Sequence, residues 1–144
     1  MTSYLHLNEF RQLELCDSSC LFNNNLNGSV IISVADHDIY EFRSIIAESF
    51  HKYQCELVIL SIDPFCLSEY HFERFLNFDL PLGIILCDTH HGNQPLTRVL
   101  KFCKISNANA VLLRFNQRHE VFFRSIGLWA GTTVISPDLQ TLIL

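Results

Sequence analysis

The chain has 144 residues and a net charge of −5, and 49% of its residues are hydrophobic. This composition excludes a disordered chain and fits one globular domain with a substantial core. Lysine and arginine form no cluster, so the negative charge argues against a chain that binds nucleic acid by itself. No apolar run reaches the roughly 18 residues that span a membrane, and the N-terminus lacks a signal segment. We therefore expect a cytoplasmic protein.

Apolar strands and amphipathic helices alternate from residue 12 onward. Residues 1–11 carry no clear periodicity, and we expect an N-terminal arm there. The predicted strands are Gln12–Asp17, Ser29–Ala35, Glu56–Asp63, Pro81–Cys87 and Ala110–Arg114. Helices are predicted between them, over residues 39–50, 68–77, 95–103 and 116–130, and Gly131 is expected to end the last helix. This alternation predicts an α/β fold with a parallel sheet.

The stretch Glu56–Asp63 is the predicted centre of the sheet. Five of its eight residues are aliphatic and run almost unbroken, which is typical of a strand buried on both faces. In open α/β sheets, ligands bind at the C-terminal ends of the strands. The polar residues Ser61 and Asp63 therefore mark the edge where function is expected.

The six cysteines indicate thiols rather than disulfides. Four of them lie inside apolar runs, and no Cys-x-x-Cys pair is present. A free cysteine behaves as a small apolar side chain. We therefore expect reduced, largely buried thiols and neither a zinc ribbon nor a redox motif.

Three stretches resemble the receiver domain of bacterial response regulators of the NarL/FixJ type, which carry a LuxR-type helix-turn-helix. Residues 107–114, Asn-Ala-Asn-Ala-Val-Leu-Leu-Arg, resemble the family's Gly-Ala-x-Gly-Tyr-Leu-Leu-Lys. Residues 131–139 resemble its exit toward the DNA-binding domain, Gly-x-x-(hydrophobic)-(hydrophobic)-Ser-Pro-x-(hydrophobic). Glu56–Ile62 resembles its Asp-Leu-Val-Leu-Leu-Asp-Ile. The resemblance implies a doubly wound, three-layer, flavodoxin-like domain over residues 12–131, with five parallel strands in the order 2-1-3-4-5, followed by a linker from residue 132.

The positions of the family's phosphorylation pocket depart from its pattern. A working receiver has two acids after strand 1, an acceptor Asp after strand 3, Thr or Ser after strand 4 and Lys after strand 5. The corresponding residues are Cys16-Asp17, Ser61 (with Asp63 nearby), Cys87 and Arg114. A serine hydroxyl cannot form an acyl phosphate, and one carboxylate makes a poor Mg²⁺ site. The resemblance thus implies a degenerate pocket that is not phosphorylated, holds no cofactor and has no enzymatic activity.

A second register would start the first strand later. Val34-Ala35-Asp36-His37 resembles the Val-Asp-Asp-His that opens many members of the family. This register leaves out the family's second strand and helix, so we prefer the register that starts at residue 12. Both lose one acid, and both predict a degenerate pocket.

Two other groups of residues suggest different chemistry. Cys87, Asp88, His90 and His91 have the side chains of a metal, ligand or redox site. Ser61, His90 and Asp88 have the composition of a hydrolase triad, although no Gly-x-Ser-x-Gly surrounds Ser61.

The sequence therefore predicts a regulatory, non-enzymatic module that resembles orphan regulators of the RcsA type. It would act by forming homodimers or by pairing with another response regulator, and would reach DNA only through a helix-turn-helix expected beyond Leu144. Candidate dimer contacts are Phe115, Phe122 and Trp129. The alternatives are a sensing module and a stand-alone antagonist that binds a response regulator.

Overall fold

A computed structural model describes residues 3–17, 28–86, 95–113, 123–124 and 129–132, and of residues 95, 112–113 and 129–132 it describes the backbone alone. The strands are β1 (Ser3–Leu7), β2 (Gln12–Asp17), β3 (Ser29–Ser33), β4 (Cys55–Ile62), β5 (Leu82–Leu86), β6 (Ala110–Leu113) and β7 (Trp129–Thr132). The longer helices are α2 (Ile39–Lys52), α3 (Glu69–Arg74) and α4 (Pro95–Ser106), and η1 (Pro64–Cys66) is a short 3₁₀ turn.

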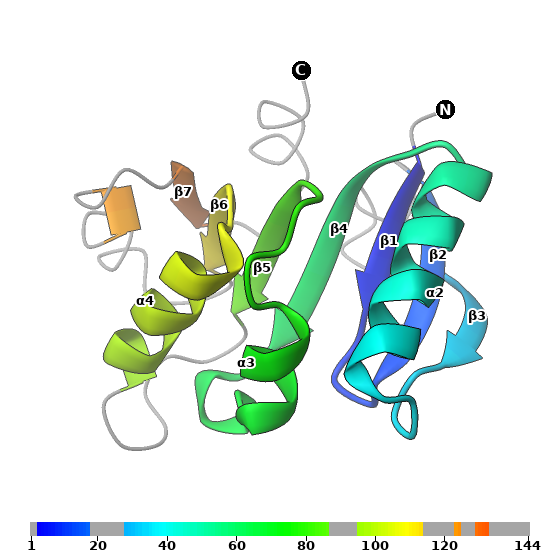
Figure 1. The fold of residues 1–144 in the computed structure, drawn as a ribbon. Coiled ribbons are helices and arrows are strands. Elements are labelled where there is room, and N and C mark those ends of the chain that lie inside the picture. The colour runs from blue at the N-terminus through cyan, green and yellow to red at the C-terminus, as the bar shows by residue number, and fades with distance from the viewer. Residues whose placement is uncertain (1–2, 18–27, 87–94, 114–122, 125–128, 133–144) are drawn as a thin grey trace.

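The seven described strands form one mixed sheet in the order β3-β2-β1-β4-β5-β6-β7 (Figure 1). Strands β1, β4, β5, β6 and β7 are parallel to their neighbours among these five. Strand β2 is antiparallel to both β1 and β3. The α/β class is as predicted, but the sheet is not purely parallel.

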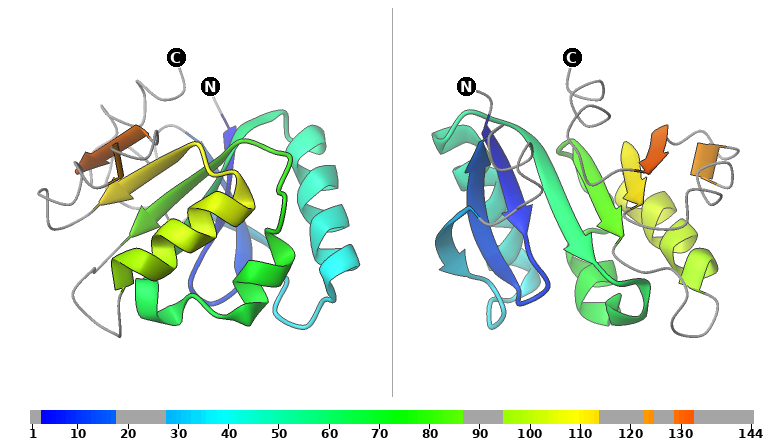
Figure 2. Two further views of the ribbon diagram at one scale, coloured as in Figure 1. Left: turned by 60° about the vertical axis from the view of Figure 1, so that its left-hand side comes forward. Right: turned by 180° about the vertical axis from the view of Figure 1, so that it is seen from behind.

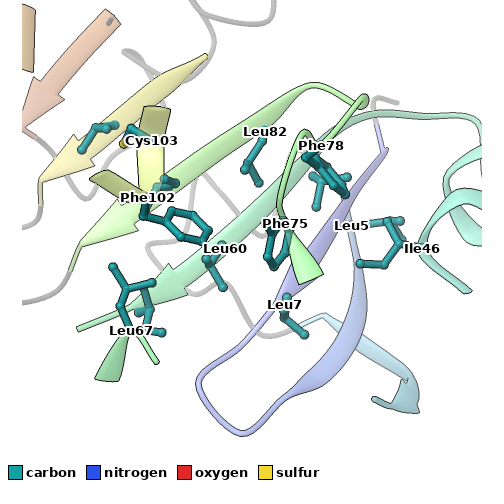
Figure 3. Close-up of a cluster of buried hydrophobic side chains, with 14 of the residues drawn as sticks. Leu5, Leu7, Ile46, Leu60, Leu67, Phe75, Phe78, Leu82, Phe102 and Cys103 are labelled. Atoms are coloured by element: carbon teal, nitrogen blue, oxygen red, sulfur yellow. The ribbon is translucent and has the colours of Figure 1, made fainter. Parts of the chain in front are cut away.

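The three longer helices lie on one face of the sheet, in front of the strands in Figure 1 and behind them in the right-hand view of Figure 2. The core between them and the sheet contains Leu5, Leu60, Leu67 and Leu82 (Figure 3). The ring of Phe75 packs edge-on against Phe42 of α2 at 5.5 Å and against Phe102 of α4 at 5.7 Å. These ring contacts connect the three helices across the core.

Over β1, β2, β4 and β5 the opposite face of the sheet also contains buried side chains. Side chains alternate between the two faces along each strand, so Tyr4, Cys16, Leu57 and Ile85 lie on the face away from these helices. All four are less than 9% exposed. A buried second face is what the unbroken apolar run of β4 predicts.

Helix α2 begins and ends where local chemistry favours it. The side chain of Asp38 accepts a hydrogen bond from the backbone N–H of Glu41 at 2.8 Å, which caps the N-terminus of the helix. Phe42 and Ile46 are buried, but Ile39 in the first turn is 40% exposed. After the helix ends, Gln54 adopts a left-handed conformation with φ of 51°, which turns the chain into β4.

The structure corrects three predictions about the elements. The expected N-terminal arm contains β1, which pairs with both β2 and β4. The helix predicted over residues 68–77 ends earlier, at Arg74, and Leu76 beyond its end is 49% exposed. Trp129 and Ala130, expected to end a helix, belong to β7, where Trp129 pairs with Ala110.

Gly28 permits the close approach of β2 and β3. A Cβ atom there would overlap the carbonyl oxygen of Leu15 and lie 2.6 Å from Sγ of Cys16. A side chain at this position would push the two strands apart. No helix that the structure describes has the length and apolar character to cross a membrane.

Candidate functional site

Asp17 and Ser61, two of the residues expected to form one pocket, lie at opposite ends of the strands. Strand β2 runs antiparallel to β1, so Asp17 pairs with Ser3, and Ser3 in turn lies beside Cys55 at the start of β4. Ser61 is six residues further along β4, about 20 Å away at 3.3 Å per residue. The prediction that Asp17 and Ser61 share a pocket is therefore wrong.

The strand between β2 and β4 is not the first strand of either predicted register. Strand β1 occupies that place, and the residues that follow it are Asn8 and Glu9. Asp36 of the second register follows β3, which β2 and β1 separate from β4. Cys87, Asp88, His90, His91, Arg114, Phe115 and Phe122 lie outside the described residues, and only the backbone of Trp129 is described.

Ser61 instead contacts His6 and, through it, is linked to Glu14. Neither residue was among the predicted site residues. Its Oγ is 2.7 Å from Nε2 of His6, and Nδ1 of the same imidazole is 2.8 Å from Oε1 of Glu14. His6 and Glu14 are each only 4% exposed. Three strands, β2, β1 and β4, thus contribute one side chain each to a continuous polar chain, which we call the Glu14–His6–Ser61 relay.

The hairpin between β1 and β2 positions two members of this relay. His6 and Glu14 are directly opposite each other in the antiparallel register. The turn between the strands is held by Asn8, whose side-chain oxygen accepts hydrogen bonds from the backbone N–H groups of Phe10 and Gln12. This is an Asx-type turn, in which the asparagine side chain replaces a backbone acceptor. An asparagine between two stretches of alternating residues was the sequence signal for the hairpin.

The hydrogen-bond partners determine which atoms of the relay carry hydrogen. A carboxylate only accepts hydrogen bonds, so Nδ1 of His6 carries the hydrogen that faces Glu14. In the neutral imidazole, Nε2 then accepts the hydroxyl proton of Ser61. A buried carboxylate without such a partner would be strongly destabilising. Each group in the relay therefore satisfies the next.

A second polar group gathers where β1 and β4 end. Burial raises the pKa of the exposed Cys66 thiol, and the nearby carboxylates of Asp63 and Glu9 raise it further. Among the described residues, no three His, Cys, Asp or Glu side chains come together in a metal-binding arrangement.

The other described cysteines are buried, in line with the prediction of reduced thiols. Cys16, Cys55 and Cys103 are free thiols with low exposure. Burial raises the pKa of Cys55 to about 11 and that of Cys103 to about 12. Thiolate is the reactive form, so these two side chains are poor nucleophiles at neutral pH.

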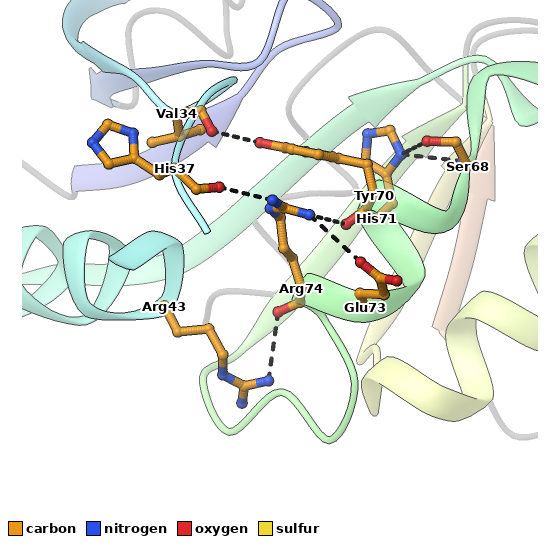
Figure 4. Close-up of polar contacts among 8 residues, drawn as sticks. All are labelled: Val34, His37, Arg43, Ser68, Tyr70, His71, Glu73 and Arg74. Carbon is orange, nitrogen blue, oxygen red and sulfur yellow. Dashed lines mark hydrogen bonds and ion pairs between the residues drawn. The ribbon is translucent and has the colours of Figure 1, made fainter. Parts of the chain in front are cut away.

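Cation–π contacts hold helix α3 against the β1–β2 hairpin. The guanidinium groups of Arg11 and Arg74 lie 3.8 and 3.9 Å from the ring centroid of Tyr70. Figure 4 shows that the hydroxyl of Tyr70 reaches the carbonyl of Val34, at 2.8 Å. The short helix α3 is thereby fixed against the β1–β2 turn and the segment that follows β3.

His71 is buried inside this cationic environment. Its Nδ1 accepts a hydrogen bond from the backbone N–H of Ser68, which completes the N-terminal cap of α3 (Figure 4). Burial, followed by the charges of Arg11 and Arg74, lowers the pKa of His71 from 6.5 to about 4. His71 is therefore neutral at physiological pH.

The Glu14–His6–Ser61 relay has the order of groups found in nucleophilic hydrolases: hydroxyl, imidazole, carboxylate. Ser61 itself lies inside β4, where its residue pairs with Ile85 of β5. A sharp turn that would expose a nucleophile is absent at this position, since β4 continues through Ile62. The geometry thus favours a structural contact over an exposed catalytic serine.

Comparisons with known proteins do not place the chain in a family: no family model matches it, and neither does any curated protein or solved structure.

Removing Glu14 is expected to destabilise the fold more than removing Ser61. Glu14→Ala should lower the free energy of unfolding by about 3 kcal/mol, because the buried Nδ1–H of His6 loses its charged hydrogen-bond acceptor. Ser61→Ala removes one hydrogen bond and should cost about 1 kcal/mol. Glu56→Ala, an exposed position on β4, is the matched control and should change stability by less than about 0.5 kcal/mol. Urea unfolding measures all three, and a Glu14→Ala variant as stable as the control would contradict the relay.

His71 should make stability depend on pH. The unfolded histidine takes up a proton near pH 6.5 and the folded one only near pH 4, so about 3 kcal/mol present above pH 6.5 is lost as the pH falls toward 4. His71→Gln retains a cap acceptor without a titrating group and should flatten this loss. His51→Gln, at an exposed position of α2, should not. Equal pH dependence of the wild type and His71→Gln in thermal unfolding would refute the assignment.

Proposed function

We propose that the chain is a receiver-like regulatory domain that is not phosphorylated. It would act in the cytoplasm by forming homodimers or by pairing with a response regulator, and so control DNA binding by a helix-turn-helix in the parent protein. Phe115, Phe122 and Trp129 remain candidate contacts for such pairing. No catalytic step and no cofactor are part of this proposal.

The strand arrangement supports the proposal in part. In the order 2-1-3-4-5 the first, third, fourth and fifth strands of a receiver lie side by side and parallel. Strands β1, β4, β5 and β6 have this arrangement, with α3 between β4 and β5 and α4 between β5 and β6. Strand β2 takes the place of the receiver's second strand but runs in the opposite direction. The antiparallel hairpin is the main departure from the family's fold.

The hydrogen bond between Ser61 and His6 carries the proposal. Ser61 stands at the end of the central strand, where the family has its acceptor aspartate, and its hydroxyl is already engaged by His6 at 2.7 Å. His6 in turn is held by a buried carboxylate. The acceptor position is thus occupied by an internal contact that does not need a phosphoryl group. A domain fixed in this way would signal through its surfaces.

A second candidate function is transfer or hydrolysis of an acyl group by Ser61. The observation that favours it is the distance of 2.7 Å from the serine oxygen to an imidazole that a carboxylate orients. In this case His6 would take the hydroxyl proton as Ser61 attacks a carbonyl carbon, and would return it to the leaving group.

Intact mass spectrometry with two reagents tests both functions. The protein is incubated with acetyl phosphate and Mg²⁺, and separately with a fluorophosphonate that labels activated serines. The regulatory function predicts no added mass in either reaction. Ser49→Ala, a buried serine on α2, controls for unspecific labelling.

Two outcomes would overturn the regulatory proposal. Gain of one phosphoryl group that Asp63→Asn abolishes would show a working receiver. Fluorophosphonate labelling that is lost in both Ser61→Ala and His6→Gln, but kept in Ser49→Ala, would establish the acyl-transfer function instead.

A further inference from the structure

Helices α3 and α4 border a surface groove of about 440 Å³. Its apolar lining consists of Phe72, Leu76 and Ile105, and Leu76 is 49% exposed. Together with Phe72 and Ile105, the exposed Leu76 offers apolar surface area to a partner. The groove is thus a candidate contact surface on the helical side of the sheet.

The two rims of the groove carry opposite charge. Glu69 and Glu73 are four residues apart on α3 and share one side of it, and Arg98 and Lys101 are three residues apart on α4. Among the described residues no ion pair spans the groove. Glu73 approaches Arg74 of its own helix at 3.9 Å, and Arg98 donates a hydrogen bond to the carbonyl of Leu67. The acidic and basic rims therefore face each other without neutralising each other.

Contacts with neighbouring elements hold both rims in position. Arg43 of α2 donates hydrogen bonds to the carbonyls of Leu76 at 2.6 Å and Asn77 at 3.3 Å, which anchors the end of α3. The ring of Phe72 packs edge-on against Phe102 of α4 at 5.5 Å. A prearranged groove loses little conformational entropy when a partner binds.

We propose that two copies of the chain associate through this groove, with a two-fold axis running parallel to it. Such an axis places the acidic α3 rim of each copy opposite the basic α4 rim of the other, twice over. A two-fold axis across the groove would instead bring α3 against α3 and α4 against α4, and like charges would repel. The charge pattern thus selects one mode of homodimer, with the apolar floors in contact.

This inference names a surface for the dimerisation proposed above and rests on that proposal. It differs from the contacts expected at Phe115, Phe122 and Trp129, because it uses the groove between α3 and α4. Failure of the groove leaves the mass measurements on Ser61 untouched, so the two proposals fail separately.

Charge exchange between the rims tests the homodimer. The acidic-rim variant is Glu69→Lys with Glu73→Lys, and the basic-rim variant is Arg98→Glu with Lys101→Glu. Each alone should raise the dimer dissociation constant by about tenfold or more in sedimentation velocity, since both contacts become repulsive. Mixing the two variants should restore a dimer, because every positive rim then meets a negative one. Higher salt should weaken the wild-type dimer.

Two controls keep the result interpretable. Lys101→Glu alone spares the hydrogen bond between Arg98 and Leu67 and should weaken the dimer in the same direction. Glu48→Lys with Glu56→Lys makes the same charge change at exposed positions outside the groove and should leave the dimer intact. A wild type that stays monomeric, rim variants that dimerise like the control, or a mixture that does not associate would each overturn the proposal.

Discussion

A buried carboxylate on a sheet face constrains the fold around it. Glu14 is 4% exposed, and its burial is tolerated because His6 lies directly opposite in the neighbouring strand and binds its carboxylate. A shift of one residue in the β1–β2 register would move Glu14 to the other face and leave His6 without it. The pair therefore fixes the hairpin, and the contact of His6 with Ser61 extends this control to β4. Strands β2, β1 and β4 are joined by one polar chain through an apolar surface.

The sequence predicted what local apolar patterns encode. The central strand was expected over residues 56–63 and spans Cys55–Ile62, and the strand Gln12–Asp17 has its predicted bounds. The pairing of that strand was wrong, because alternation gives a strand's faces and not its neighbour or direction. Glu14 lies in an alternating strand, and only the asparagine at the turn, Asn8, points to a partner eight residues earlier. Trp129 continued a helical stripe, yet it pairs in β7.

The relay and the groove have separate roles in the proposed function. The relay fills the end of the central strand with internal hydrogen bonds, and the proposed function takes this contact in place of a receiver's phosphorylation site. The groove offers charges that remain unpaired across it and an apolar floor. The proposed association with a partner rests on this combination of a fixed centre and a charged surface. Packing among α2, α3 and α4 positions the groove, whereas the relay lies on the other face of the sheet, the face of Tyr4 and Leu57.

The protonation state of His6 is the most direct test of the central claim. Heteronuclear NMR of the histidine side chains distinguishes the two tautomers and detects protons held in hydrogen bonds. The account predicts that Nδ1 of His6 carries a strongly deshielded, slowly exchanging proton, that Nε2 acts as an acceptor, and that the signal disappears in Glu14→Ala. A hydrogen on Nε2 alone, exchanging freely with solvent and unaffected by Glu14→Ala, would contradict it.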